Sequence, residues 1–136
     1  MDATAAIGDR SVRVRFSIDT GADYTVLQPR AAQAILGSQY FSIHFETDVN
    51  RFNLYGISGS PSEYVIRNAT LTFSDEQGAP LAIDLPVLIA RPSTPQPTPD
   101  SNWEAPSLLG QDALRSFDLA LSYNPPSVSL TESAPL

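Results

Sequence analysis

A carboxylate at the end of a strand-like run has the clearest chemical potential in this sequence. Residues 17–26 read Ser-Ile-Asp-Thr-Gly-Ala-Asp-Tyr-Thr-Val, with Asp19 at the head of an Asp-Thr-Gly triplet. Apolar residues alternate along 12–18, and strand-forming residues follow at 25–27. The pattern predicts a strand that delivers Asp19 into a tight glycine turn, followed by a second short strand. Alone, the triplet is more typical of a surface turn, because Asp, Thr and Gly are ordinary turn residues.

Two further segments carry glycines between extended or helical runs. Residues 54–60 read Leu-Tyr-Gly-Ile-Ser-Gly-Ser and are flanked by extended residues at 41–45 and 64–66, which predicts a hairpin with a flexible tip. Residues 107–114 read Ser-Leu-Leu-Gly-Gln-Asp-Ala-Leu. The apolar residues before Gly110 predict a short strand, and the apolar face at helical spacing after it predicts a helix that begins at once. Each segment taken singly is also typical of a plain hairpin turn or an ordinary strand-to-helix junction.

Together, the three segments resemble the retropepsin-like (retroviral-type) aspartic protease family, in its single-domain cellular or bacterial type. The first resembles the signature hydrophobic-Asp-Thr-Gly-Ala-Asp-x-Thr-Val-hydrophobic. The second resembles the Gly-Ile-Gly-Gly flap, with Ser58 in place of a glycine, and the third the hydrophobic-hydrophobic-Gly-Arg-Asp/Asn segment, with Gln111 in place of the arginine. Their order and approximate spacing agree over residues 12 to 130, and the combination is more specific than any single motif.

The resemblance implies a catalytic site that two chains share. In this chemistry two carboxylates face each other across a water and hold one proton between them. The ionised carboxylate takes a proton from the water, and the protonated one polarises the scissile carbonyl. One triplet supplies half of this site, so the resemblance implies a two-fold homodimer in which each subunit contributes Asp19. The implied function is an aspartic endopeptidase that hydrolyses peptide bonds in a peptide or protein substrate.

The same resemblance assigns roles to neighbouring residues. Beside Asp19, Thr20 would bond across the two-fold axis and Gly21 would allow close approach of the backbone. The implied substrate-binding residues line the floor of the cleft, bind the peptide backbone, or belong to the flap and an adjacent strand: Ala22, Asp23, Gly56, Ile57, Ser58, Gly59 and Leu108.

The glutamine at position 111 departs from the family pattern. The family's arginine at this position commonly pairs with the acid that corresponds to Asp23. Here the pairing is expected to be replaced, with Arg10 of the partner subunit or Arg13 of the partner subunit as candidates, or to be absent.

The resemblance implies an all-β fold, a closed retropepsin-like β-barrel or sandwich half-lobe with a flap hairpin and one or two short helices, as a single domain over residues 1–136. Pro29 near the start and Gly37 after the end predict a helix at 29–37, and a second helix is expected at about 111–116. Residues 1–8 and 132–136 are expected to fray. Expected strands are 11–18, 24–27, 41–46, 50–56, 61–73, 80–90, 106–109, 117–123 and 127–131.

A Pro-rich insertion occupies residues 91–106. Its composition is unsuited to a strand and predicts an extended loop. In the family, the connection at this point is short and borders the substrate pockets. The longer loop here contains the only tryptophan, Trp103, which could contact a substrate side chain or pack against its own domain. A disordered insertion is the simpler alternative.

Composition argues against several other kinds of site. The 136 residues include no Cys and a single His, His44, and the net charge is −7 with dispersed charges. A thiolate nucleophile, a thiolate metal site and a Ser-His triad are therefore excluded or disfavoured, and no metal or organic cofactor is expected. Nucleic acid is a poor partner, because phosphate binding needs clustered cations. No apolar run reaches membrane-spanning length and no signal pattern begins the chain, so a cytoplasmic location is expected.

Two other functions remain compatible with the residues. A non-catalytic peptide-binding or dimerisation module could use the same fold, since a cleft and flap can hold a peptide without cutting it. An acidic β-sandwich without a site would require the three motifs to lie far apart in space.

Overall fold

The computed structural model describes residues 1–55, 61–75, 77–123 and 126–132, and side chains are described up to Phe117 with the exception of residues 56–61 and 76. Along the chain lie β1 (Asp2–Ile7), β2 (Arg10–Ile18), β3 (Val26–Leu27), α1 (Pro29–Leu36), the 3-10 helix η1 (Gly37–Ser42), β4 (Arg51–Tyr55), β5 (Pro61–Ser74), β6 (Pro80–Ala90), η2 (Asn102–Glu104), β7 (Ser107–Leu109), α2 (Gln111–Leu114), β8 (Phe117–Tyr123) and β9 (Pro126–Glu132).

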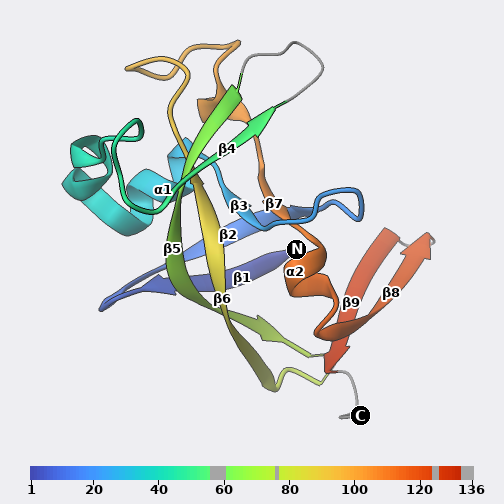
Figure 1. Ribbon diagram of the computed structural model, residues 1–136. Coiled ribbons are helices and arrows are strands. Elements are labelled where there is room, and N and C mark those ends of the chain that lie inside the picture. Colours follow the sequence, from blue (N-terminus) through green and yellow to red (C-terminus); the bar gives the residue numbers. More distant parts are fainter. Residues whose placement is uncertain (56–60, 76, 124–125, 133–136) are drawn as a thin grey trace.

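Six strands of the described chain close into a barrel. The order is β1-β2-β7-β3-β6-β5, and β5 returns to pair with β1. Strand β4 adds to the outer edge of β5, while β8 and β9 form a separate hairpin beside the barrel (Figure 1). The expected all-β barrel with two short helices is therefore confirmed. No helix in the described part of the chain is long and apolar enough to cross a membrane.

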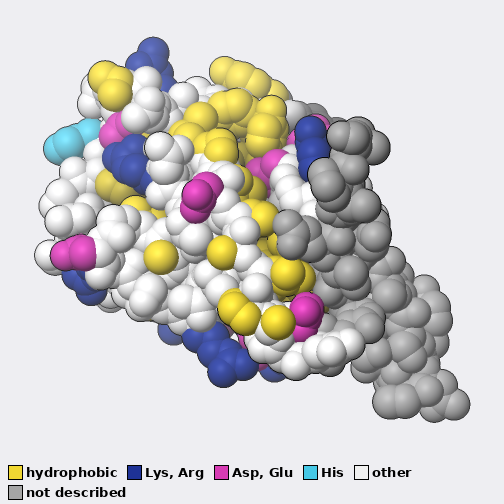
Figure 2. Space-filling model, turned by 90° about the horizontal axis from the view of Figure 1, so that it is seen from below, with side chains coloured by type: hydrophobic (Ala, Val, Ile, Leu, Met, Phe, Trp, Pro, Cys, Tyr) yellow, Lys and Arg dark blue, Asp and Glu magenta, His cyan; other side chains and the backbone are white. Residues whose placement is uncertain are grey.

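The residues of the long strands that point to one side of the sheet are buried, and they form one core inside the barrel. Val65, Ala69, Leu71 and Phe73 of β5 are buried, and they pack with buried residues of β1, β2 and β6. Helix α1 covers one side of the barrel (Figure 1), and its residues Ala32, Ile35 and Leu36 belong to the core. On the face seen in Figure 2, charged side chains of both signs are dispersed around a band of hydrophobic ones.

The helix predicted after the second strand is confirmed at both ends. Pro29 occupies the first turn, where a backbone N–H has no helical partner. Gly37 follows the last residue with φ of 62°, a left-handed conformation that favours glycine.

Two local predictions are wrong. Residues 1–8 do not fray: β1 pairs with β2 on one side and with β5 on the other, and Ala3 and Ala5 are buried. Residues 41–46 are not a strand, because the chain turns so that both Tyr40 and Phe45 enter the core. The hydroxyl of Tyr40 donates to the carbonyl of Ala90 at 2.6 Å, and burial raises its pKa.

Candidate active site

Strand β7 holds Asp19 at the end of β2. The two strands are parallel, with Phe16 opposite Ser107 and Ile18 opposite Leu109. The ladder continues one residue further, because the N–H of Asp19 donates to the carbonyl of Leu109 at 3.1 Å. The register therefore places the half-buried Asp19 beside the Leu109-Gly110 step that the third motif contains.

The turn after Asp19 is built from its own polar atoms. The N–H of Gly21 donates to Asp19 Oδ1 at 3.0 Å, and the N–H of Ala22 donates to the carbonyl of Asp19 at 3.1 Å. Thr20, Gly21 and Asp23 are exposed, and Ala22 is half-buried. The backbone thus orients one carboxylate oxygen of Asp19. The loop that follows Asp19 lies at the surface of the barrel.

A second set of bonds ties residues 22–25 to the start of α2. The N–H groups of Gln111 and Asp112 donate to the carbonyls of Ala22 and Asp23, at 2.8 and 3.1 Å. These N–H groups begin a helix and have no partner within it, so the loop backbone satisfies them. The first and third motifs, almost ninety residues apart in sequence, form one unit.

The buried Thr25 is the centre of that unit, a role that the sequence interpretation did not assign. Its hydroxyl donates to Asp112 Oδ1 at 2.7 Å and accepts the N–H of Gly110 at 3.2 Å, while its own N–H donates to Asp112 Oδ2 at 3.1 Å. Because the carboxylate takes bonds that a strand partner would otherwise supply, β3 is shorter than predicted and covers only residues 26 and 27. Thr25 and Asp112 lie within the first and third sequence motifs, and this was the only indication of their role in the sequence.

Gly110 permits the close approach that the sequence predicted. A Cβ atom at this position would lie 2.4 Å from the carbonyl oxygen of Tyr24 and 2.5 Å from its carbonyl carbon. Both are backbone atoms that cannot rotate away, so the junction has no space for a side chain.

The glutamine at position 111 makes a contact of its own. Its Nε2 donates to the carbonyl of Thr20 at 2.7 Å and so joins α2 to the Asp-Thr-Gly turn. No ion pair among the described residues reaches Asp23. Within one chain, Arg13 pairs with Asp2 at 3.2 Å. The expected pairing of Arg13 with Asp23 of a second subunit stays a prediction.

A second apolar cluster connects the Asp19 side of the barrel with the hairpin. Val26, Leu88 and Ala90 are buried in it, and Phe52, Tyr64, Ile66 and Leu108 pack against them partly exposed. The ring of Tyr24, 42% exposed, meets Phe52 edge-on at 5.2 Å between centroids. Leu108, an expected substrate-binding residue, belongs to this surface.

The predicted hairpin has two paired arms. Strands β4 and β5 are antiparallel, with Arg51 opposite Val65 and Tyr55 opposite Pro61. The strand expected at 50–56 is therefore confirmed as the upstream arm, and residues 41–45 are not part of it. The tip residues expected to bind substrate, Gly56, Ile57, Ser58 and Gly59, lie outside the described residues.

The Pro-rich loop lies at the end of the barrel where β4 lies (Figure 1), and hydrogen bonds within the loop fix its shape. Asn102 Nδ2 donates to the carbonyl of Arg91 at 2.8 Å, and the indole N–H of Trp103 donates to the carbonyl of Thr94 at 2.9 Å. Trp103 is only 2% exposed and meets the ring of Tyr40 edge-on. Of the two alternatives for this tryptophan, it packs against its own domain.

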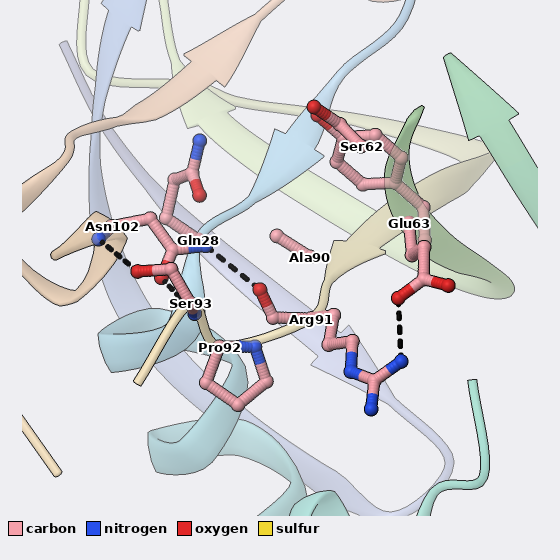
Figure 3. Close-up of a pocket in the computed structure, with 9 residues that line it drawn as sticks. Gln28, Ser62, Glu63, Ala90, Arg91, Pro92, Ser93 and Asn102 are labelled. Carbon is pink, nitrogen blue, oxygen red and sulfur yellow. Dashed lines mark hydrogen bonds and ion pairs between the residues drawn. The ribbon is translucent and has the colours of Figure 1, made fainter. Parts of the chain in front are cut away.

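A cavity of about 370 Å³ separates this loop from the start of β5, and Figure 3 shows Ser62 and Glu63 facing Pro92, Ser93 and Asn102 across it. At its rim, one guanidinium, that of Arg91, bridges Glu63 at 2.5 Å and Glu46 at 2.6 Å. These bonds raise the pKa of Arg91. The pKa of Glu46 is lowered first by a hydrogen bond from the backbone N–H of Glu46 and then by the bond from Arg91. The charges tie the loop to the hairpin arm.

Within the described residues, no group of three or more His, Asp or Glu side chains is arranged to hold a metal ion. Comparison with models of protein families and with curated protein sequences finds no match for this chain. Function is therefore inferred from the arrangement of Asp19 and the residues that support it.

Proposed function

We propose that this chain is a retropepsin-like aspartic endopeptidase that hydrolyses peptide bonds as a homodimer, at acidic to mildly acidic pH. The observation that carries the proposal is the joining of two distant motifs around Asp19, by the bond from its N–H to Leu109 and the bonds of Thr25 to Asp112. An ordinary surface turn has no need of such a buried polar support.

In the proposed mechanism, Asp19 of each subunit faces the two-fold axis and the two carboxylates share one proton. Like charges held close together cannot both ionise, so the titration belongs to the pair. The ionised carboxylate removes a proton from water, and the resulting hydroxide equivalent attacks the scissile carbonyl carbon. The protonated carboxyl donates a hydrogen bond to the carbonyl oxygen as negative charge develops there. The tetrahedral adduct then re-forms the carbonyl as its C–N bond breaks, and the carboxyl that took the proton from water gives it to the leaving amine. Gln111 restrains the carboxylate's loop through the carbonyl of Thr20.

The proposed substrate is an extended peptide with apolar side chains near the scissile bond. The support is the partly exposed apolar surface that includes Phe52, Tyr64 and Leu108, on the side of the barrel that leads to the hairpin. Burying an apolar side chain against such a surface contributes about 25 cal/mol for each Å² removed from water. The hairpin would close over the peptide and exclude water.

The deciding experiment compares Asp19→Asn with Asp9→Asn, an exposed aspartate in the turn between β1 and β2 that serves as the control for loss of one charge. Cleavage of an unbiased peptide library is followed by mass spectrometry between about pH 4 and 7. Because symmetry makes one substitution two, we expect Asp19→Asn to lower turnover by at least about 10³-fold. The control should cleave as the wild type does.

Protein concentration provides an independent readout. Specific activity should fall on dilution together with the dimer fraction, measured by light scattering, because one chain holds half of the dyad. Wild-type turnover by Asp19→Asn, or full activity of a demonstrable monomer, would refute the shared-aspartate mechanism.

The second candidate is a non-catalytic peptide-binding module, which the unusual Gln111 favours. Binding of library peptides without cleavage at any pH, unchanged by Asp19→Asn, would decide for this function.

A further inference from the structure

Three arginines surround a groove on the outside of the barrel, away from the Asp19 loop. The groove, of about 330 Å³, lies between β2, α1 and the segment 103–107, and its lining includes Arg13, Arg15 and Arg30. None of the residues 19–23 lines it. Arg15 stands four residues before Asp19 on the same strand, which corresponds to about 13 Å along the chain.

The acidic side chains paired with these arginines do not neutralise all of their positive charge. Arg13 and Arg15 share a single carboxylate, that of Asp2, at 3.2 and 3.9 Å, and Arg30 pairs with Glu104 at 2.7 Å. Three cations therefore meet two anions, in a chain whose net charge is −7. The guanidinium-bearing side chains are 78%, 88% and 62% exposed, so these ion pairs contribute little and can exchange partners.

The spacing suits an extended acidic segment. Arg13 and Arg15 lie two apart on a strand, so they project from the same face about 7 Å from each other. Alternate side chains of an extended peptide repeat at the same interval. Arg30 of α1 stands across the groove, and Ala31, Ala34 and Pro106 offer apolar surface for the methylene groups of Glu side chains. A guanidinium binds a carboxylate through two parallel N–H···O bonds.

We propose that this groove is a docking site for an acidic, extended peptide segment, bound through its carboxylates by Arg13, Arg15 and Arg30. Within one chain the site is separate from the Asp19 loop, and it binds independently of catalysis. On a protease it would select substrates or partners by an acidic stretch outside the cleaved bond. That consequence rests on the proposed function, whereas the binding itself does not.

The test measures binding directly, by fluorescence anisotropy of a labelled ten-residue peptide of alternating Glu and Ser. The matched Gln-Ser peptide is the uncharged control. We expect the acidic peptide to bind, the control not to bind, and affinity to fall between about 50 and 300 mM salt because the contacts are exposed ion pairs. Asp19→Asn should bind as the wild type does, which separates docking from the catalytic proposal.

Paired substitutions locate the site. Arg13→Gln with Arg15→Gln should weaken binding about tenfold or more, the loss of more than one charge-assisted contact. Arg51→Gln with Arg115→Gln removes the same charge from exposed arginines elsewhere and should change affinity less than about twofold. Arg13→Lys with Arg15→Lys keeps the charge without the planar fork and should recover part of the affinity.

Three results would overturn the proposal: equal losses for the two Gln pairs, equal affinity for the Gln-Ser peptide, or no binding of the acidic peptide to the wild-type protein. Binding of inorganic phosphate alone, with none of the Glu-Ser peptide, would identify a simple anion site instead and would equally refute it. Thermal unfolding of each variant, expected to match the wild type because the side chains are exposed, controls for folding.

Discussion

Gly110→Ala tests the close junction between the Asp19 loop and α2. The backbone at Gly110 is extended, with φ of −96° and ψ of −176°, a conformation that alanine adopts without strain. Any cost is therefore steric. The added Cβ would lie 2.5 Å from the carbonyl carbon of Tyr24, whereas carbon atoms normally approach to about 3.5 Å. The two segments must separate by about 1 Å to admit one methyl group.

The expected loss of stability follows from what this separation disturbs. Inserting a methyl group into a packed site costs about 1–3 kcal/mol, and the upper value applies because the obstructing atoms belong to the backbone. Displacing Tyr24 also moves Thr25, whose bonds to Asp112 contribute about 1 kcal/mol or more. We expect a total loss of about 4 kcal/mol, a large part of the roughly 5–15 kcal/mol available to a domain.

Urea unfolding at fixed protein concentration measures the effect, and Gly21→Ala is the matched comparison. A Cβ at Gly21 would lie 3.3 Å from Asp19 Oδ1, a side-chain atom that can move, so the expected loss there is below about 1 kcal/mol. Equal unfolding midpoints for the two variants would refute the steric reasoning. So would a Gly110→Ala protein as stable as the wild type.

Two further substitutions probe buried and charged contacts. Thr25→Val keeps the shape of the side chain but removes its bond to Asp112 Oδ1 and leaves the N–H of Gly110 without its acceptor, so we expect a loss of about 2 kcal/mol in urea unfolding; a neutral result would show that water replaces the hydroxyl. Arg67→Gln tests pH dependence, because the guanidinium of Arg67 holds the pKa of Asp48 below its usual value. A depressed pKa stabilises the fold above the usual value, about 4, and the contribution is lost as pH falls through the folded-state pKa. The difference in stability between wild type and Arg67→Gln should therefore be present at neutral pH and shrink toward pH 3, and a difference that is constant with pH would contradict this.

Local sequence patterns determined much of the architecture. The strands at 10–18, 61–74 and 80–90 follow apolar patterns that the sequence displays, and the limits of α1 follow from Pro29 and Gly37. These features were predictable because they depend on neighbours in sequence, through side-chain alternation and backbone angles. The placement of Asp19 at the end of a strand was predictable for the same reason.

Tertiary contacts decided the rest. Strand β1 consists largely of small and polar residues with a weak apolar pattern, and it is ordered because two strands pair with it. The aromatic residues at 40–45 are consistent with a strand locally, but burial of both Tyr40 and Phe45 requires a turn. The Thr25–Asp112 pair and the arginine groove join residues that lie about ninety positions apart in the sequence. Local propensity cannot reveal such contacts, because only barrel closure brings the segments together and repays the entropy of ordering them.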